Sequence, residues 1–192
     1  MTNYETQAEL DDATCLSLGR FVMFFSGLIH SLENATEALS NLVTTEDKIN
    51  FKASISKFTA GVMLDKFSST FTSYWGSALA KNDHEILDGV KRELKALIDQ
   101  RNRLMHDVWV NKMVGGTENI PQHKARHRTI IQNTNLSYET IDYSPEVVEK
   151  LISDTKRLTL VVNRMYRYSR PGMVGPELHP RIKISAGKVN TQ

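Results

Sequence analysis

Apolar residues spaced alternately by three and four positions form the strongest pattern in this chain. The spacing puts them on one face of an α-helix from about residue 13 to residue 43. A helix of this length is not stable alone with its apolar face in water, so further helices are expected to pack against it. The residues of this face are Leu18, Phe21, Phe25, Leu28, Leu32, Ala35, Leu39 and Leu42.

The same alternation predicts more helices along the chain. A short helix is expected at about 46–58, followed by a break at Thr59-Ala-Gly61. A third helix carries the apolar residues from Leu64 to Leu79, and a fourth carries those from Leu87 to Leu104. A last helix carries those from Val148 to Met165. Together these segments predict a helical bundle.

A β insertion is expected just before the last helix. Thr129-Ile-Ile131 and Tyr138-Glu-Thr-Ile141 contain the β-branched and aromatic residues typical of strands, and Asn133-Thr-Asn135 between them is typical of a turn. We predict a hairpin or three-stranded flap over about 108–143. Ser144-Pro145 then starts the last helix, with serine as the cap and proline at the first helical position.

The fold class is therefore mainly α: a bundle of about four to five helices with a small β-hairpin insertion before the last helix. The chain has 192 residues, a length that fits one domain, and we place this domain at 1–170. Residues 171–192 contain prolines and glycines without periodicity and are expected to be a flexible tail.

The sequence also favours a cytoplasmic protein. Cys15 is the one cysteine, so no internal disulfide can form. The first residues lack the basic and apolar regions of a signal peptide. The longest apolar run, 21–25, is far shorter than a membrane span, so no membrane association is expected.

Charge is divided unevenly along the chain, although the net charge is only +2. Residues 1–121 contain 12 basic and 16 acidic side chains, whereas residues 122–192 contain 12 and 6. This weak overall bias argues against a protein that coats nucleic acid without selection, but it allows local phosphate binding by the second part.

Arg101 lies at an apolar position of the fourth predicted helix, on the stripe of Leu94, Leu97 and Leu104. A guanidinium there must be paired, hydrated in a cleft or placed at an interface, because burying it alone is costly. On a continuous helix Arg101 and His106 are about 140° apart. They can meet on one side if the helix ends near His106, or if a second subunit contributes its own pair.

Arginine and histidine suit the cleavage of RNA without a metal. An imidazole, with an ordinary pKa of about 6.5, can take the proton of a ribose 2′-hydroxyl or protonate the leaving 5′-oxygen. A guanidinium stabilises the charge that builds on the phosphate. Asn102 lies four residues before His106 and can orient the ring or the phosphate. A structural role remains open, in which Arg101 pairs with a carboxylate such as Asp99 and His106 interacts with the helix dipole.

The string Arg101-Asn-Arg-Leu-Met-His106 resembles the motif of HEPN domains, in which an arginine, often followed by asparagine, precedes a histidine near the end of a helix. An aromatic residue follows the histidine in many members, as Trp109 does here. The resemblance is specific over 99–109 and extends in outline over 13–168. One toxin subgroup has a tyrosine two residues after the histidine. Val108 stands there in this chain, so regulation through that tyrosine is not expected.

This resemblance implies a metal-independent endoribonuclease that leaves a cyclic phosphate and a 5′-hydroxyl. Arg101 and His106 would be catalytic and Asn102 supporting, at a composite site shared by two subunits, so a homodimer is expected. Family members often act as toxins with an antitoxin partner or in anti-phage defence. No cofactor or metal is implied. The alternative is a HEPN-like module without catalysis that binds RNA or nucleotides, or serves as a scaffold for a partner protein.

Basic side chains after Gln122 are the candidate RNA contacts. Lys124, Arg126 and Arg128 would neutralise phosphates beside the active site, or form a solvated loop at a strand edge. His123 and His127 are four residues apart, but the segment does not resemble a helix, so no metal site is expected. Arginines on the last helix could line an RNA groove, although a charged outer face is the simpler interpretation. These are Arg157, Arg164, Arg167 and Arg170.

Overall fold

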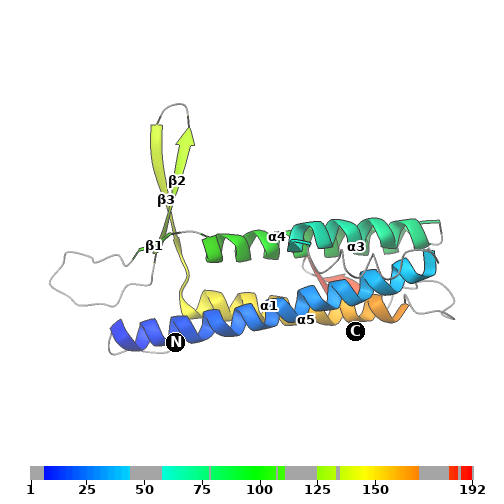
Figure 1. The fold of residues 1–192 in the computed structure, drawn as a ribbon, viewed down its shortest axis with the longest axis horizontal. Helices are drawn as coiled ribbons and strands as arrows, with labels where there is room; N and C mark the ends of the chain where they lie inside the picture. The colour runs from blue at the N-terminus through cyan, green and yellow to red at the C-terminus, as the bar shows by residue number, and fades with distance from the viewer. Residues whose placement is uncertain are drawn as a thin grey trace. The chain divides into compact units, whose positions relative to one another are not determined.

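The computed structural model describes residues 7–43, 58–77, 79–106, 108–110, 125–132, 135–168, 182–185 and 187–191. Over these residues the chain forms α-helices, a three-stranded sheet and a separate two-stranded hairpin (Figure 1). The predicted helical bundle with a small β insertion before the last helix is confirmed. The short helix predicted at about 46–58 falls almost entirely outside the described residues.

Four helices are described. They are α1 (Gln7–Val43), α3 (Ala60–Trp75), α4 (Lys81–His106) and α5 (Pro145–Tyr168). The predicted break at Thr59-Ala-Gly61 agrees with the structure at Thr59, which is extended with φ −67° and ψ 159°, but Ala60 and Gly61 already belong to α3. The Thr59 hydroxyl accepts a hydrogen bond from Val62 N at 3.5 Å and caps the helix. The helix ends at Trp75, so Leu79 lies beyond it.

The start of α5 agrees with the prediction from Ser144-Pro145. The Ser144 hydroxyl accepts a hydrogen bond from Val147 N at 3.3 Å, which satisfies one of the free N–H groups of the first turn. Pro145 is the first helical residue, where its missing N–H has no cost.

The β insertion is a three-stranded antiparallel sheet with the order β1-β2-β3. Its strands are β1 (Val108–Val110), β2 (Ala125–Gln132) and β3 (Asn135–Asp142). Gln132 pairs with Asn135, so two residues separate the long strands, as the predicted turn requires. Figure 1 shows β2 and β3 as a long two-stranded hairpin, and β3 continues into α5.

The described chain groups into two compact units. The first consists of residues Met1–Met23 and Gln100–Ser153, and therefore contains the start of α1, the end of α4, the sheet and the start of α5. Arg20 on α1 and Glu149 on α5 form an ion pair in it, 2.5 Å between Nη1 and Oε1. Buried apolar side chains of this unit are Phe21, Leu104, Tyr143, Val148, Leu151 and Ile152.

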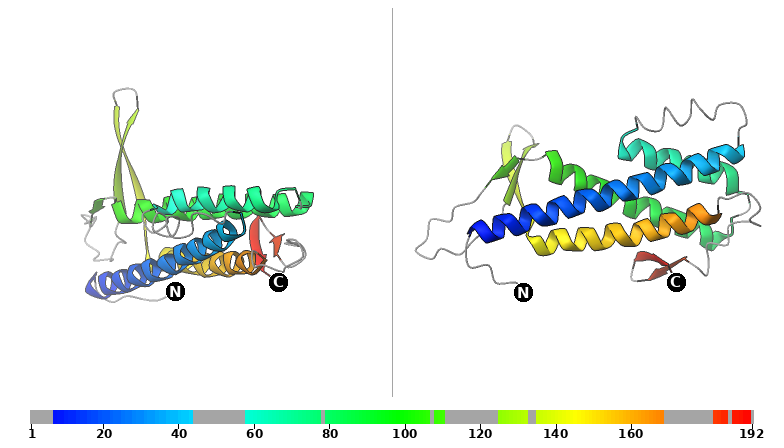
Figure 2. Two further views of the ribbon diagram at one scale, coloured as in Figure 1. Left: turned by 45° about the vertical axis from the view of Figure 1, so that its right-hand side comes forward. Right: turned by 60° about the horizontal axis from the view of Figure 1, so that its bottom comes forward.

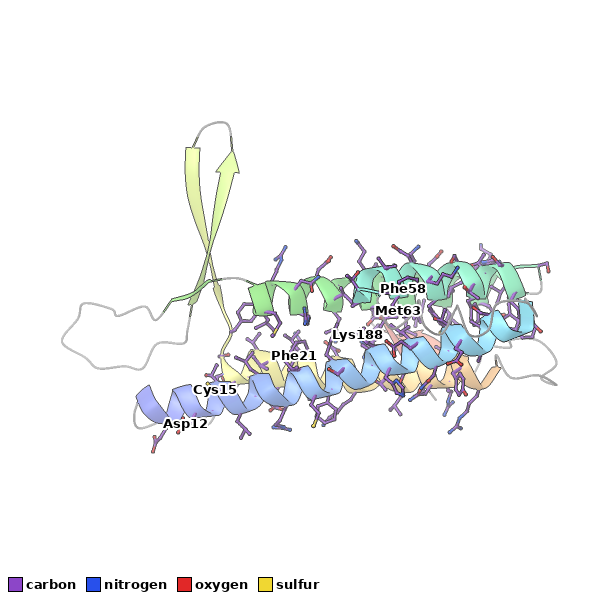
Figure 3. The ribbon with its side chains drawn as sticks, viewed as in Figure 1. Asp12, Cys15, Phe21, Phe58, Met63 and Lys188 are labelled. Carbon is purple, nitrogen blue, oxygen red and sulfur yellow. The ribbon has the colours of Figure 1, made fainter. Side chains whose placement is uncertain are left out.

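The second unit consists of Phe24–Asp99 and Asp154–Gln192. Its core brings α1 and α3 together: the Thr36 hydroxyl lies 3.9 Å from the sulfur of Met63, which Figure 3 labels. Thr36 also donates to Leu32 O at 2.7 Å, so its buried hydroxyl is satisfied within the helix. Fully buried side chains here include Leu28, Leu32, Leu39, Phe67, Phe71, Leu94 and Met165.

The second unit also contains a hairpin in the segment that was predicted to be a flexible tail. Strands β4 (Ile182–Ser185) and β5 (Lys188–Thr191) pair antiparallel, and Figure 2 shows them in red beside α5. Gly187 adopts φ 74° in the turn, a conformation that glycine tolerates best. Ile182 and Val189 are fully buried. The expectation of a flexible tail is therefore wrong for these residues, because their apolar side chains join the core.

Helix α1 is long and apolar enough over Asp12–Ser40 to cross a membrane, judged by length and composition. The core helix of a soluble protein passes the same test. One face of α1 is in fact buried here, with Phe21, Leu28 and Leu32 fully covered.

Candidate functional site

The predicted arginine lies at the end of α4, in the first unit. Arg101 is half-buried, although its stripe neighbours Leu97 and Leu104 are only 3% and 2% exposed. Its Nη1 donates a hydrogen bond to Asn102 Oδ1 at 3.2 Å. Asn102 and Arg103 are exposed. The guanidinium and the amide are thus in direct contact at the surface, where a polyanion can reach them.

His106 is the last residue of α4, and the structure describes it through its backbone. Because α4 is continuous from Arg101 to His106, the two residues are about 7.5 Å apart along the axis and about 140° apart around it. One copy of α4 therefore carries them on different sides.

The strand register connects the predicted basic segment to the end of α4. A single residue separates His106 from Val108, where β1 begins, and β1 pairs with β2. In this pairing Trp109 lies opposite Arg126, and Val108 lies opposite His127. Arg128 lies opposite Glu139 of β3. The sheet therefore brings Arg126 and its neighbours close in space to the motif, although 19 residues separate Arg126 from His106 in sequence.

The open alternative of a solvated loop does not hold for Arg126 and Arg128, because both belong to β2. Lys124 lies outside the described residues, as does His123. No group of three or more histidine, cysteine, aspartate or glutamate side chains is placed to hold a metal ion among the residues that the structure describes.

Arg157 belongs neither to an RNA groove nor to a charged outer face, and both interpretations of it were wrong. Its Nη2 lies 2.5 Å from Glu93 Oε2, and its Nη1 donates to the main-chain oxygen of Val189. The other carboxylate oxygen of Glu93 accepts from Val189 N at 2.5 Å. With Arg157 and Glu93 only 18% and 14% exposed, this cluster holds β5 against α4 and α5.

Asp154 and Lys188 add a second link to the same hairpin. The Asp154 carboxylate lies 2.6 Å from the Lys188 ammonium and 3.3 Å from Arg157 Nη2. Partial burial alone would raise the pKa of Asp154, but the hydrogen bond and charge of Lys188, with the charge of Arg157, outweigh it. The pKa therefore lies below its usual value near 3.8.

Gly89 allows β5 to approach α4 closely. A Cβ at this position would lie 2.8 Å from Val189 Cγ2, a distance that side chains do not tolerate without movement. Phe71 and Trp75 of α3 are buried, in agreement with the core role that their helical spacing favours. The roles of Gly89 and Glu93 were not predicted, and a glycine in the middle of an amphipathic helix was the available signal.

No known protein family, curated protein or solved structure matches this chain. The residues at the end of α4 and the sheet that follows them are therefore the features of this chain that indicate a function.

Proposed function

We propose that this chain is a homodimeric, metal-independent ribonuclease of the HEPN type. The observation that carries the proposal is the placement of Arg101 and Asn102, hydrogen-bonded at the surface, on a helix that ends at His106. On one α4 the two residues are about 7.5 Å apart along the helix axis.

The chemistry follows from the two side chains. His106 takes the proton of the ribose 2′-hydroxyl, whose oxygen attacks the adjacent phosphorus, and the bond to the 5′-oxygen breaks. The products are a cyclic phosphate and a 5′-hydroxyl, and the leaving oxygen is protonated by a histidine or by water. Arg101 stabilises the extra negative charge on the phosphate oxygens. Asn102, in contact with Arg101, holds the guanidinium in position.

The angular separation of the two residues supports a site built from two copies. With about 140° between them on one α4, a second α4 can place its histidine across the scissile phosphate from Arg101 of the first. The basic residues Arg126 and Arg128 then bind the RNA strand on either side of the cut. An enzyme that cleaves cellular or viral RNA in this way could act as a toxin or as an anti-phage protein.

Cleavage of single-stranded RNA in the presence of a chelator tests the proposal. We expect wild-type protein to release fragments with cyclic phosphate ends, and His106→Ala and Arg101→Ala to lose at least about a hundredfold in rate. Arg103→Ala, an exposed arginine on the same helix, is the matched control and should retain activity. RNA that is bound in a salt-dependent way but never cut would instead identify a binding module and reject the nuclease.

A further inference from the structure

The exposed side of α1 carries apolar side chains arranged symmetrically about a glycine. Leu16 and Val22 lie three residues before and after Gly19, and Cys15 and Met23 lie four residues before and after it. Leu16 is 66% exposed, Met23 61% and Val22 36%, and Cys15 is also exposed. At 100° per residue all five positions fall within a sector of about 120° whose middle is Gly19.

We propose that residues 15–23 of α1 form a homodimer contact in which α1 packs antiparallel against α1 of a second copy and crosses it at Gly19. In that arrangement Leu16 of one copy lies opposite Val22 of the other, and Cys15 lies opposite Met23. Each contact occurs twice, as a two-fold axis requires.

Gly19 permits the close approach that such a crossing needs. A Cβ built at this position meets nothing within 4 Å, so the space over the glycine is open. Helices approach most closely where small residues lie at the crossing point. The apolar residues on both sides can then reach one another across the gap.

The charge on this surface suits a second copy of the same chain. Arg20 is the one charged residue in 15–23, and it is paired with Glu149 of its own chain at 2.5 Å. Two such surfaces therefore meet without uncompensated repulsion. An unrelated partner or a lipid surface would give no reason for the symmetry about Gly19.

The opposite face of α1 is already covered by the protein, because Phe21 is fully buried and Thr14 and Ser17 are buried polar residues. The surface around Gly19 is therefore the face of this segment that remains for a second copy. A standard stable interface buries roughly 800 Å² per partner, and the few apolar side chains of this contact would bury less than that. We therefore expect a reversible dimer with a Kd of micromolar order.

This inference goes beyond the proposed function, since it concerns α1 and not the ends of α4, and dimerisation is measured without RNA. A failure to dimerise and a failure to cleave RNA are therefore separate results. Sedimentation velocity from micromolar to submillimolar concentrations should show a monomer–dimer equilibrium for the wild-type chain. Leu16→Glu should weaken it at least about tenfold, because the new carboxylate would lose its hydration in an apolar contact. Leu160→Glu, on α5 and 60% exposed, is the matched control and should leave it unchanged.

Disulfide formation tests the direction of packing. In a Cys15→Ser background, Gly19→Cys places both thiols at the crossing, where the Cα atoms can come within the distance that a disulfide spans. It should cross-link rapidly on mild oxidation. In the wild-type chain the two Cys15 residues are about 12 Å apart along the axes and should not cross-link. Lys150→Cys in the same background reports random collisions and should cross-link slowly.

Three outcomes would overturn the proposal. The first is a wild-type chain that stays monomeric at every concentration, and the second is a dimer that Leu16→Glu leaves intact. The third is rapid cross-linking through Cys15 in the wild-type chain, which indicates parallel packing. A monomer that binds lipid vesicles through Leu16 would identify a membrane as the occupant of this surface and would equally reject the dimer.

Discussion

Glu93 and Arg157 together hold both main-chain polar groups of a single residue of β5. Glu93 accepts from the N–H of Val189 while Arg157 donates to its carbonyl, and the two side chains are themselves paired at 2.5 Å. In a hairpin closed by two residues, the main-chain N–H and C=O groups of the second residue pair from the turn point away from the opposite strand. The two side chains therefore provide for Val189 the hydrogen bonds that a neighbouring strand would provide.

Glu93→Gln should destabilise the fold. An amide can still accept from Val189 N, but it leaves the largely buried charge of Arg157 with only the more distant Asp154. We expect a loss of about 1–3 kcal/mol in the free energy of unfolding, measured by urea denaturation. Glu149→Gln is the matched control, since the Arg20–Glu149 pair is more than two-fifths exposed and should contribute less than about 0.5 kcal/mol. Equal losses in the two variants would show that the Glu93 pair has no special role.

Gly89→Ala should also be destabilising, although alanine is the better helix former by about 1 kcal/mol. The added methyl group would overlap with Val189 Cγ2. The double variant Gly89→Ala/Val189→Ala should recover part of the loss, because it removes the overlapping methyl group. Gly27→Ala, where nothing lies within 4 Å of the new Cβ, should instead be stabilising. A stabilising effect of Gly89→Ala would contradict the close packing of β5 on α4.

Acid should weaken the link between α5 and the hairpin. Since the pKa of Asp154 in the folded chain lies below its usual value near 3.8, its contribution to stability is complete above that value and is lost as the pH falls through the lower, folded value. The difference in unfolding free energy between wild type and Asp154→Asn should therefore be constant from neutral pH to about pH 5 and shrink below about pH 4. A difference that stays constant down to pH 2 would show that Lys188 and Arg157 do not stabilise the carboxylate.

Mixing two inactive variants should restore ribonuclease activity if each active site takes Arg101 from one copy and His106 from the other. Arg101→Ala and His106→Ala chains that exchange freely form mixed dimers with one intact site, so we expect about a quarter of wild-type activity. The measurement is the cleavage rate of a labelled RNA after the chains have been mixed at high concentration. No recovery, in mixtures that are shown to contain mixed dimers, would place a complete site within one chain.

Arg126→Ala and Arg128→Ala should each weaken RNA binding for every sequence tested. Each removes one contact to phosphate, so the slope of log binding constant against log salt should fall by about 1. Fluorescence anisotropy of a labelled RNA in the His106→Ala background measures binding without cleavage. Lys95→Ala, on the exposed side of α4, is the control. A salt slope that is unchanged in both arginine variants would remove β2 from the RNA surface.

The helices could be predicted from the sequence because the information that sets them is local. The three-four spacing identifies α1, α4 and α5, and Ser144-Pro145 places the start of α5 at the observed residue. Thr59 is a further local signal: the chain is extended there, within the predicted break, and the threonine side chain caps the helix that follows. Only the bounds of the break differ, because Ala60 and Gly61 are helical.

The β4–β5 hairpin could not be predicted in the same way, because what holds it is far away in sequence. Val189 is bonded to a carboxylate 96 residues earlier, on α4, and to Arg157, 32 residues earlier on α5. No window of a few residues contains that information. Arg101 is the opposite case: a charge on an apolar stripe stands out in sequence, and the structure places it half-exposed at the surface.

The single residue between His106 and Val108 joins the last turn of a helix directly to the first strand of a sheet. Each residue has two free backbone torsions, so any rotation of the sheet relative to the helix takes place next to His106. If RNA binding moved β2, the movement would therefore reach the backbone next to His106. In the proposed enzyme, the strand that binds RNA and the helix end that carries the histidine are thus connected through β1 and a single residue.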